Sequence, residues 1–215
     1  MVTLPGIASP PAGPVTSDGA NNTINGGFIR AREGFTTSGV IPRENGNILG
    51  QSGVTVGNGV DLGSKTVQQL KELGIAQDII DKLTPYLGKQ RQAAADYLKD
   101  HPLSLTQKQA EDLSNTFLQK SANDVANKFN SDSKVGRFSD LPSNTKTVLA
   151  DIYHQYGVQL YNTNFWKQVT GGDWQGAYNN LMNFDDLYRT RRQLEVGLLN
   201  QDIQANSLPK PAEHH

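Results

Sequence analysis

Short apolar stretches at helical spacing dominate the chain, and one Gly-rich segment interrupts them near its beginning. Residues 36–63 hold seven glycines and alternate valines with Gly and hydroxyl residues, which predicts hairpins and loops. Before and after this segment, apolar positions recur as they do in amphipathic helices. The pattern predicts an α+β fold with a small β-hairpin lobe, a larger helical lobe and a cleft between them that suits a polymer.

Capping residues set the expected helix ends. Asn22 or Thr23 begins a short helix that ends near Arg32. Its buried face is expected to carry Ile24, Phe28 and Ala31. Ser64 is expected to cap a second helix, which Gly74 ends in a left-handed conformation.

Further helices follow in the second half of the chain. A Thr106–Gln109 capping box predicts a helix with apolar positions from Ala110 to Leu118. The other helices are expected at about 76–83, with another opened by Pro85, and at about 143–156, 162–169, 173–182 and 185–203.

The two ends of the chain differ in composition from the rest. Residues 1–22 are rich in Pro, Gly and Ser, which predicts a flexible leader or linker and a delivery or binding module upstream. Residues 206–215 are expected to form a tail, and its two terminal His to be a tag remnant. One domain is therefore expected at 23–205.

Composition excludes several functions. The net charge of -1 gives no support for sequence-independent nucleic-acid binding, and the absence of Cys excludes a thiol nucleophile or thiolate metal site. No apolar stretch is long enough for a membrane span, and the start of the chain lacks a signal-peptide pattern. Delivery by a secretion system, uptake or phage lysis is therefore expected for action outside the cytoplasm.

Two carboxylates and a hydroxyl carry the candidate chemistry. Glu33 ends the first expected helix, and Thr55 and Asp61 lie in the hairpin segment, where Asp61 is followed by Gly63. One carboxyl group can protonate a departing glycosidic oxygen, and the other can hold or deprotonate a water on the opposite face of the sugar. Backbone N–H groups near Asp61 are expected to hold its carboxylate. The Gly57-x-Gly59 pair lacks the rest of a phosphate-binding loop.

These residues resemble a known family. Thr55 follows Glu33 by twenty-two positions and Asp61 follows Thr55 by six, which is similar to the Glu…Thr…Asp arrangement of the pesticin-like lysozymes in the phage-type superfamily. In many phage lysozymes the aspartate precedes the threonine, so the order here fits the pesticin branch. The resemblance spans about 24–200, with the hairpin 52–63 as its most specific part and 153–157 and 174–198 as weaker matches.

The resemblance implies a lysozyme fold and a muramidase that acts on peptidoglycan glycan strands in the bacterial periplasm, as an antibacterial effector, bacteriocin or endolysin domain. Glu33 would then be the general acid, Asp61 with Thr55 would orient the attacking water, and the phage-type analogy favours inversion. No cofactor is expected, a monomer is the default, and an immunity protein is a candidate partner. The alternatives are a lytic transglycosylase or chitinase on the same fold, and a non-catalytic glycan-binding module.

Three further residues are weaker candidates for substrate contact. Glu44 lies in the loop from Pro42 to Gly46, His154 lies on an expected helix beside two tyrosines, and Arg191 is half of an Arg pair with Arg192. The ordinary interpretations are a solvated turn, a packed side chain and a solvated charged face. No partner at metal-ligand spacing accompanies His154, so no metal is expected.

Overall fold

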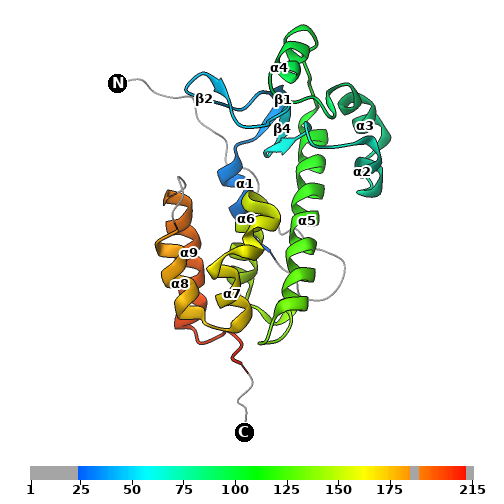
Figure 1. Ribbon diagram of the computed structural model, residues 1–215. Coiled ribbons are helices and arrows are strands. Elements are labelled where there is room, and N and C mark those ends of the chain that lie inside the picture. Colours follow the sequence, from blue (N-terminus) through cyan, green and yellow to red (C-terminus); the bar gives the residue numbers. More distant parts are fainter. Residues whose placement is uncertain (1–23, 185–188, 212–215) are drawn as a thin grey trace. The chain divides into compact units, whose positions relative to one another are not determined.

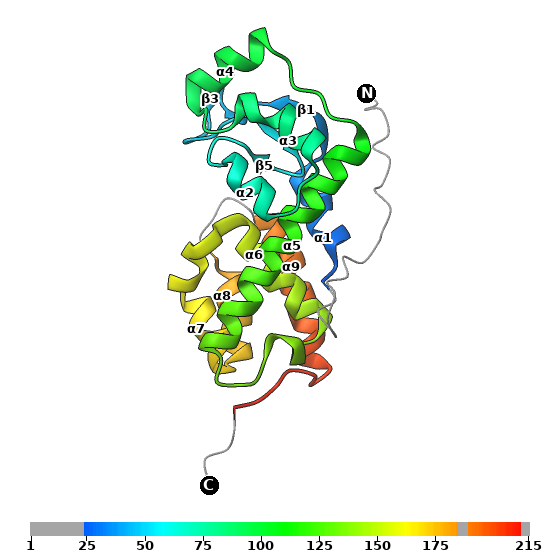
Figure 2. The same cartoon turned by 90° about the vertical axis from the view of Figure 1, so that its right-hand side faces the viewer.

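The computed structural model of the protein describes residues 24–184 and 189–211, with the Glu33 side chain outside the described part. The chain divides into two compact units (Figures 1 and 2). One comprises Glu33–Lys120, here called the sheet unit. The other comprises the chain up to Arg32 and from Ser121 onward, here called the helical unit. The cleft predicted between two lobes stays a prediction.

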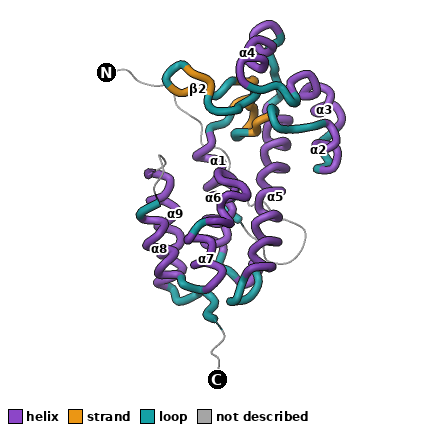
Figure 3. Tube along the Cα trace, in the orientation of Figure 1, coloured by secondary structure: helices purple, strands orange, loops and turns teal. Residues whose placement is uncertain are grey.

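The described strands all belong to the sheet unit (Figure 3). Strands β1 (Thr36–Val40), β4 (Thr55–Gly57) and β5 (Val60–Asp61) form an antiparallel sheet in the order β1-β4-β5. Strands β2 (Arg43–Glu44) and β3 (Asn47–Ile48) form a separate two-stranded hairpin. The hairpins predicted for residues 36–63 are therefore confirmed, and the fold is α+β.

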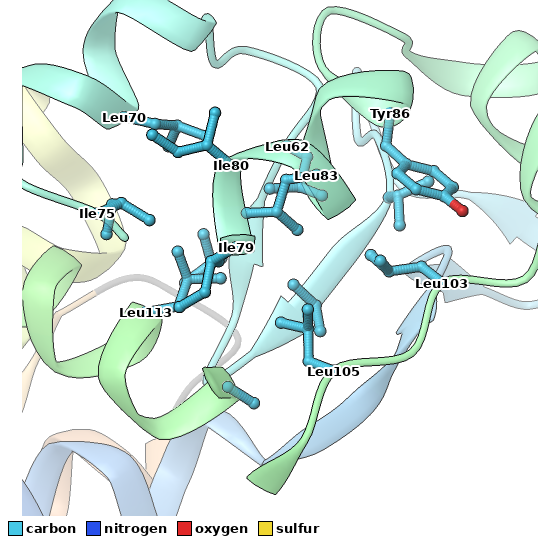
Figure 4. Packing of buried hydrophobic residues seen from close by; sticks show 14 of the residues in the cluster. Leu62, Leu70, Ile75, Ile79, Ile80, Leu83, Tyr86, Leu103, Leu105 and Leu113 are labelled. Carbon is cyan, nitrogen blue, oxygen red and sulfur yellow. The ribbon is translucent and has the colours of Figure 1, made fainter. Parts of the chain in front are cut away.

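The core of the sheet unit lies between this sheet and its helices (Figure 4). Val56 and Val60 face each other across β4 and β5, and both are buried. Because alternate strand residues point to opposite faces, the flanking residues of each strand point away from this core. Around the two valines the core also contains Val54, Leu62, Leu70, Ile75, Ile79, Ile80, Leu83, Tyr86, Ala94, Leu103, Leu105, Ala110 and Leu113.

Local hydrogen bonds fix the helix ends of the sheet unit. Helix α2 (Val67–Glu72) begins after Thr66, which forms a capping box with Gln69, so the predicted cap at Ser64 is wrong. The predicted left-handed Gly74 (φ +70°) and the Thr106–Gln109 capping box are confirmed. Helix α3 (Gln77–Leu83), the 3-10 turn η1 (Thr84–Tyr86) and helix α4 (Arg91–Asp100) follow, so Pro85 opens only a 3-10 turn. Helix α5 (Gln107–Asp132) belongs to the sheet unit up to Lys120 and to the helical unit from Ser121.

In the helical unit, helices α6 (Ser143–Tyr156), α7 (Asn164–Gly171), α8 (Trp174–Met182) and α9 (Arg189–Gln204) pack against one another (Figures 1 and 2). Helix α6 packs against α9, and α8 packs against both α7 and α9. Trp166 and Trp174 are buried in the core of this unit. Two 3-10 elements, η2 (Phe138–Asp140) and η3 (Gly157–Asn162), precede and follow α6.

The first helix begins later than the sequence predicts. Helix α1 (Gly26–Glu33) is capped by Asn25, whose Oδ1 accepts a hydrogen bond from the Phe28 N–H at 2.9 Å. Ile29, 1% exposed, lies in the core, whereas Ala31 is exposed, so the prediction that Ala31 lies on the buried face is wrong. The predicted caps Asn22 and Thr23, the predicted leader at 1–22 and the start of the 185–203 helix lie outside the described residues.

The predicted tail begins with a packed segment. Leu208 is buried, and the Pro209 carbonyl accepts a hydrogen bond from Trp174 Nε1 at 2.7 Å. This part of residues 206–215 therefore contributes to the core of the helical unit, and residues 212–215 lie outside the described part.

Candidate active site

Thr55 and Asp61 are direct partners across the β4–β5 hairpin. Directly opposite residues of an antiparallel pair point to the same face, with Cβ atoms roughly 4.5–5.5 Å apart. The neighbouring pair, Val56 and Val60, fills the core on the other face, so the register cannot slip without burying the polar pair. The fold of the hairpin therefore holds a hydroxyl and a carboxylate side by side on the face away from the core.

Two backbone donors orient the Asp61 carboxylate. Its Oδ1 accepts hydrogen bonds from the N–H of Gly63 at 2.7 Å and of Gly53 at 3.0 Å. The two glycine backbones pack so closely that a Cβ on Gly53 would lie 2.5 Å from Gly63 Cα. Oδ2 accepts no hydrogen bond from any described residue, so one carboxylate oxygen is fixed and the other is available. The prediction that backbone N–H groups hold Asp61 is confirmed.

The Thr55 side chain is half-buried, and its hydroxyl forms no hydrogen bond with any residue that the structure describes. On the other side of β4, Thr55 pairs with Val40 of β1, which is 43% exposed. A Thr in the middle of a sheet with no hydrogen bond for its hydroxyl can bind water or a polar ligand there.

Glu33 is connected to the same hairpin through its backbone. It ends α1, Gly34 follows with φ +67°, and β1 starts at Thr36, whose partner in the sheet is Gly57. Asn58 Nδ2 also donates a hydrogen bond to the Gly34 carbonyl at 2.7 Å. Glu33 thus belongs to the same unit as Thr55 and Asp61, and its backbone lies beside the turn between β4 and β5.

Asn58 is a residue that sequence reasoning misses. Gly57 and Gly59 match only a fragment of a phosphate-binding loop, and this match assigns no function to Asn58 between them. An Asn between two glycines in a hairpin is a turn signal, but its 7% exposure cannot be derived from local sequence.

Glu44 also belongs to the sheet unit, but it lies on strand β2 rather than in a loop. It pairs with Asn47 next to the turn formed by Asn45 (φ 50°) and Gly46 (φ 84°), and it is exposed. An Asn-Gly turn of this kind is the ordinary connection of a two-residue hairpin. Substrate contact by Glu44 stays a prediction.

His154 and Arg191 belong to the helical unit. His154 lies on α6, half-buried, with its Nδ1 3.4 Å from Ser121 Oγ, and its contact with substrate stays a prediction. Arg191 is only 8% exposed and binds Asp151 of α6 in a two-point ion pair, with Nε–Oδ2 at 3.1 Å and Nη2–Oδ1 at 2.5 Å. The alternative of a solvated Arg191–Arg192 face is wrong, because both side chains are buried.

The Arg191–Asp151 pair is part of a larger buried charge cluster. Arg192 is 3% exposed and donates hydrogen bonds to Glu195 and to Gln155. Glu195 and Asp151 are both fully buried, and Glu195 Oε1 accepts no hydrogen bond from any described residue. Burial raises the pKa of Glu195 to about 9, the neighbouring Asp151 carboxylate adds to the rise, and Arg192 opposes it. Burial and the neighbouring carboxylate therefore favour the protonated form of Glu195 in the folded protein.

This proton makes stability depend on pH. The pKa of Glu195 is raised from an ordinary value of 4.5 to about 9 on folding, so the folded protein binds this proton more tightly than the unfolded chain does. The free energy of unfolding should therefore fall as pH rises through that range, by at most ~1.4 kcal/mol per pH unit for one proton. Glu195→Gln, which is neutral at every pH, should lose this part of the pH dependence of the free energy of unfolding. Urea unfolding at a series of pH values measures it. Glu72→Gln, at an exposed position of α2, is the matched control. A pH dependence of the free energy of unfolding that is unchanged in Glu195→Gln would contradict its assignment to Glu195.

Among the described residues, no group of three or more His, Asp or Glu side chains is arranged to hold a metal ion. No helix in the described part of the chain is both long and apolar enough to cross a membrane.

A small antiparallel sheet unit that carries a Thr–Asp pair, joined to a helical unit, defines a lysozyme-like α+β protein. The chain belongs to the Pesticin family, described as a bacterial toxin homologue of phage lysozyme, C-terminal part, whose model matches residues 23–175. The match includes Glu33, Thr55, Asp61, Glu44 and His154, and Arg191 lies beyond it. A search of curated proteins found no significant match. The chain thus carries a lysozyme-type domain of a bacterial toxin family.

Proposed function

We propose that this protein is a muramidase that hydrolyses the β-1,4 bond between N-acetylmuramic acid and N-acetylglucosamine in bacterial peptidoglycan. The observation that carries the proposal is the Thr55–Asp61 pair, in which one carboxylate oxygen is fixed by two backbone N–H groups. A hydroxyl and a carboxylate oxygen without other hydrogen bonds among the described residues suit the binding of one water. Membership of a lysozyme-homologous toxin family supports the same activity.

In the proposed reaction, Glu33 donates its proton to the glycosidic oxygen as the bond to the anomeric carbon breaks. The water held by Thr55 and Asp61 attacks that carbon from the opposite face, and Asp61 accepts the proton that the water loses. Exchange with solvent then returns a proton to Glu33 and removes one from Asp61. Attack from the opposite face inverts the anomeric configuration.

The site of action follows from the substrate. A toxin domain of this kind acts on the bacterial cell wall, and peptidoglycan is reached in the periplasm after delivery from outside or by a secretion machine. A producing cell exposed to its own toxin would need an immunity protein as a partner.

The test is digestion of purified peptidoglycan followed by mass spectrometry of the soluble fragments. The wild-type protein should release muropeptides with reducing muramic-acid ends, and proton NMR of early products should show the inverted anomer. Asp61→Asn should lower the rate by about 10²-fold or more, because an amide cannot accept the proton from water. The amide oxygen can still accept from Gly53 and Gly63, so the variant should fold.

Asp81→Asn, at an exposed position of α3, is the matched control and should retain the wild-type rate. Anhydro-muramic ends would contradict hydrolysis and indicate a lytic transglycosylase. A folded wild-type protein that binds glycan strands but releases no fragments would indicate a binding module.

A further inference from the structure

Asn58 lies at the turn between β4 and β5, and it is buried although its side chain is polar. Buried amides in folded proteins are hydrogen-bonded, and their partners show which parts of the chain they hold together. Two of the hydrogen bonds of Asn58 reach segments that are distant from it in the sequence, at Gly34 and Ser114.

The first contact joins the turn to the end of α1. Asn58 Nδ2 donates to the Gly34 carbonyl at 2.7 Å, and Gly34 is the residue directly after Glu33. The second contact joins the turn to α5. The Asn58 N–H donates to Ser114 Oγ at 2.9 Å, and that hydroxyl donates to the Ala110 carbonyl at 2.6 Å. Asn58 therefore connects the chain after Glu33, the hairpin and α5 within one unit.

The turn has little freedom to move away from α5. Gly57 adopts φ +66°, and a Cβ at this position would lie 2.3 Å from Ser114 Oγ. The backbone of the turn thus packs directly on the helix, and the position of Asn58 is set by this contact as well as by its own hydrogen bonds.

We propose that Asn58 is a positioning residue that holds Glu33 in place relative to Thr55 and Asp61. The inference rests on the proposed function, in which Glu33 is the acid and the Thr55–Asp61 pair holds the water. The Gly34 carbonyl belongs to the peptide next to the one that carries Glu33, and Asn58 lies on the hairpin that carries the pair. This hydrogen bond joins the backbone beside the acid to the hairpin that carries the base, closer to Glu33 than the pairing of Thr36 with Gly57 does.

The test compares Asn58→Ala and Asn58→Asp with the wild type, using kcat and KM for solubilised peptidoglycan glycan strands. Removal of the donor should lower kcat by about 10- to 100-fold, because a displacement of roughly 1 Å in a catalytic group has that effect. KM should stay within about twofold, because Asn58 is buried and acts through the backbone of Glu33 rather than on the glycan. Asn47→Ala, at an exposed position of β3, is the control and should leave kcat unchanged.

The pH profile separates positioning from a general loss of structure. In the Asn58→Asp variant, the new carboxyl group can donate to the Gly34 carbonyl when it is protonated, whereas its ionised form repels that oxygen. The kcat of Asn58→Asp relative to the wild type should therefore rise as pH falls, and the ratio for Asn58→Ala should stay flat. Circular dichroism and the thermal midpoint at each pH give the folded fraction.

Each outcome has a defined meaning. An active wild type with folded Asn58 variants of unchanged kcat would overturn the positioning role and leave the proposed function standing. A loss of activity that only follows the folded fraction would also overturn it. An inactive wild type would overturn the proposed function and the positioning role with it.

Discussion

Glu33→Gln should abolish cleavage of purified peptidoglycan while leaving the protein folded and able to bind glycan strands. Gln has nearly the same shape as a protonated Glu, but it has no proton to transfer to a departing glycosidic oxygen. Loss of general acid catalysis lowers rates by about 10²–10⁴-fold, and we expect a value near the upper end because glycosidic oxygens leave poorly without a proton. The rate of new reducing ends measures cleavage, and co-sedimentation with insoluble peptidoglycan measures binding.

Glu72→Gln makes the same chemical change at an exposed position of α2 in the same unit, so it controls for the loss of a carboxylate as such. It should cleave at the wild-type rate. Full activity of Glu33→Gln would mean that the acid lies elsewhere in the chain. Loss of binding and of cleavage together, with altered circular dichroism, would instead indicate that the substitution disturbs folding.

The parts of the fold that the sequence predicted well are those set by local chemistry. Alternating Val and Gly residues predicted the hairpin because side-chain alternation and positive backbone angles leave few other conformations. The Thr106–Gln109 capping box predicted the start of α5, since two reciprocal hydrogen bonds settle where that helix begins. Helix α6 (Ser143–Tyr156) has the predicted bounds, with Pro142 immediately before it.

Competition between neighbouring caps explains the errors at helix ends. Ser64 and Thr66 can both cap α2, and Thr66 is the cap because Gln69 stands three residues after it. At α1 the predicted caps precede Asn25, which is used instead.

Contacts between distant segments left no signal in the sequence. Asp151 and Arg191 are forty positions apart and belong to separate helices, so neither periodicity nor spacing reveals their ion pair. The same holds for the hydrogen bond from Asn58 to the Gly34 carbonyl. Glu33, Thr55 and Asp61 could be predicted from the resemblance to a family. The hydrogen bond by which Asn58 joins their segments is seen only in the structure.

Asp151→Ala should be among the most destabilising single substitutions in the helical unit. Asp151 is fully buried on α6 and pairs at two points with Arg191, which is itself 8% exposed. Removing one partner of a buried ion pair leaves an uncompensated charge and costs roughly 3–5 kcal/mol. Glu195 lies in the same cluster, with its Oε1 3.8 Å from Arg191 Nε, so its ionisation would offset part of this charge. Urea unfolding at neutral pH measures the loss.

A double-mutant cycle with Arg191→Met separates the pair from its surroundings. The double variant should be less destabilised than the sum of the two single variants, because neither charge is then left buried alone. Asp112→Ala breaks the exposed Lys108–Asp112 pair on α5 and should leave the free energy of unfolding nearly unchanged. Because the Asp151 carboxylate helps to raise the pKa of Glu195, Asp151→Ala should also lower that pKa. The pH dependence of the free energy of unfolding assigned to Glu195 should then be smaller in the Asp151→Ala variant. If the double-mutant cycle is additive and this pH dependence is unchanged, these groups do not act as one cluster.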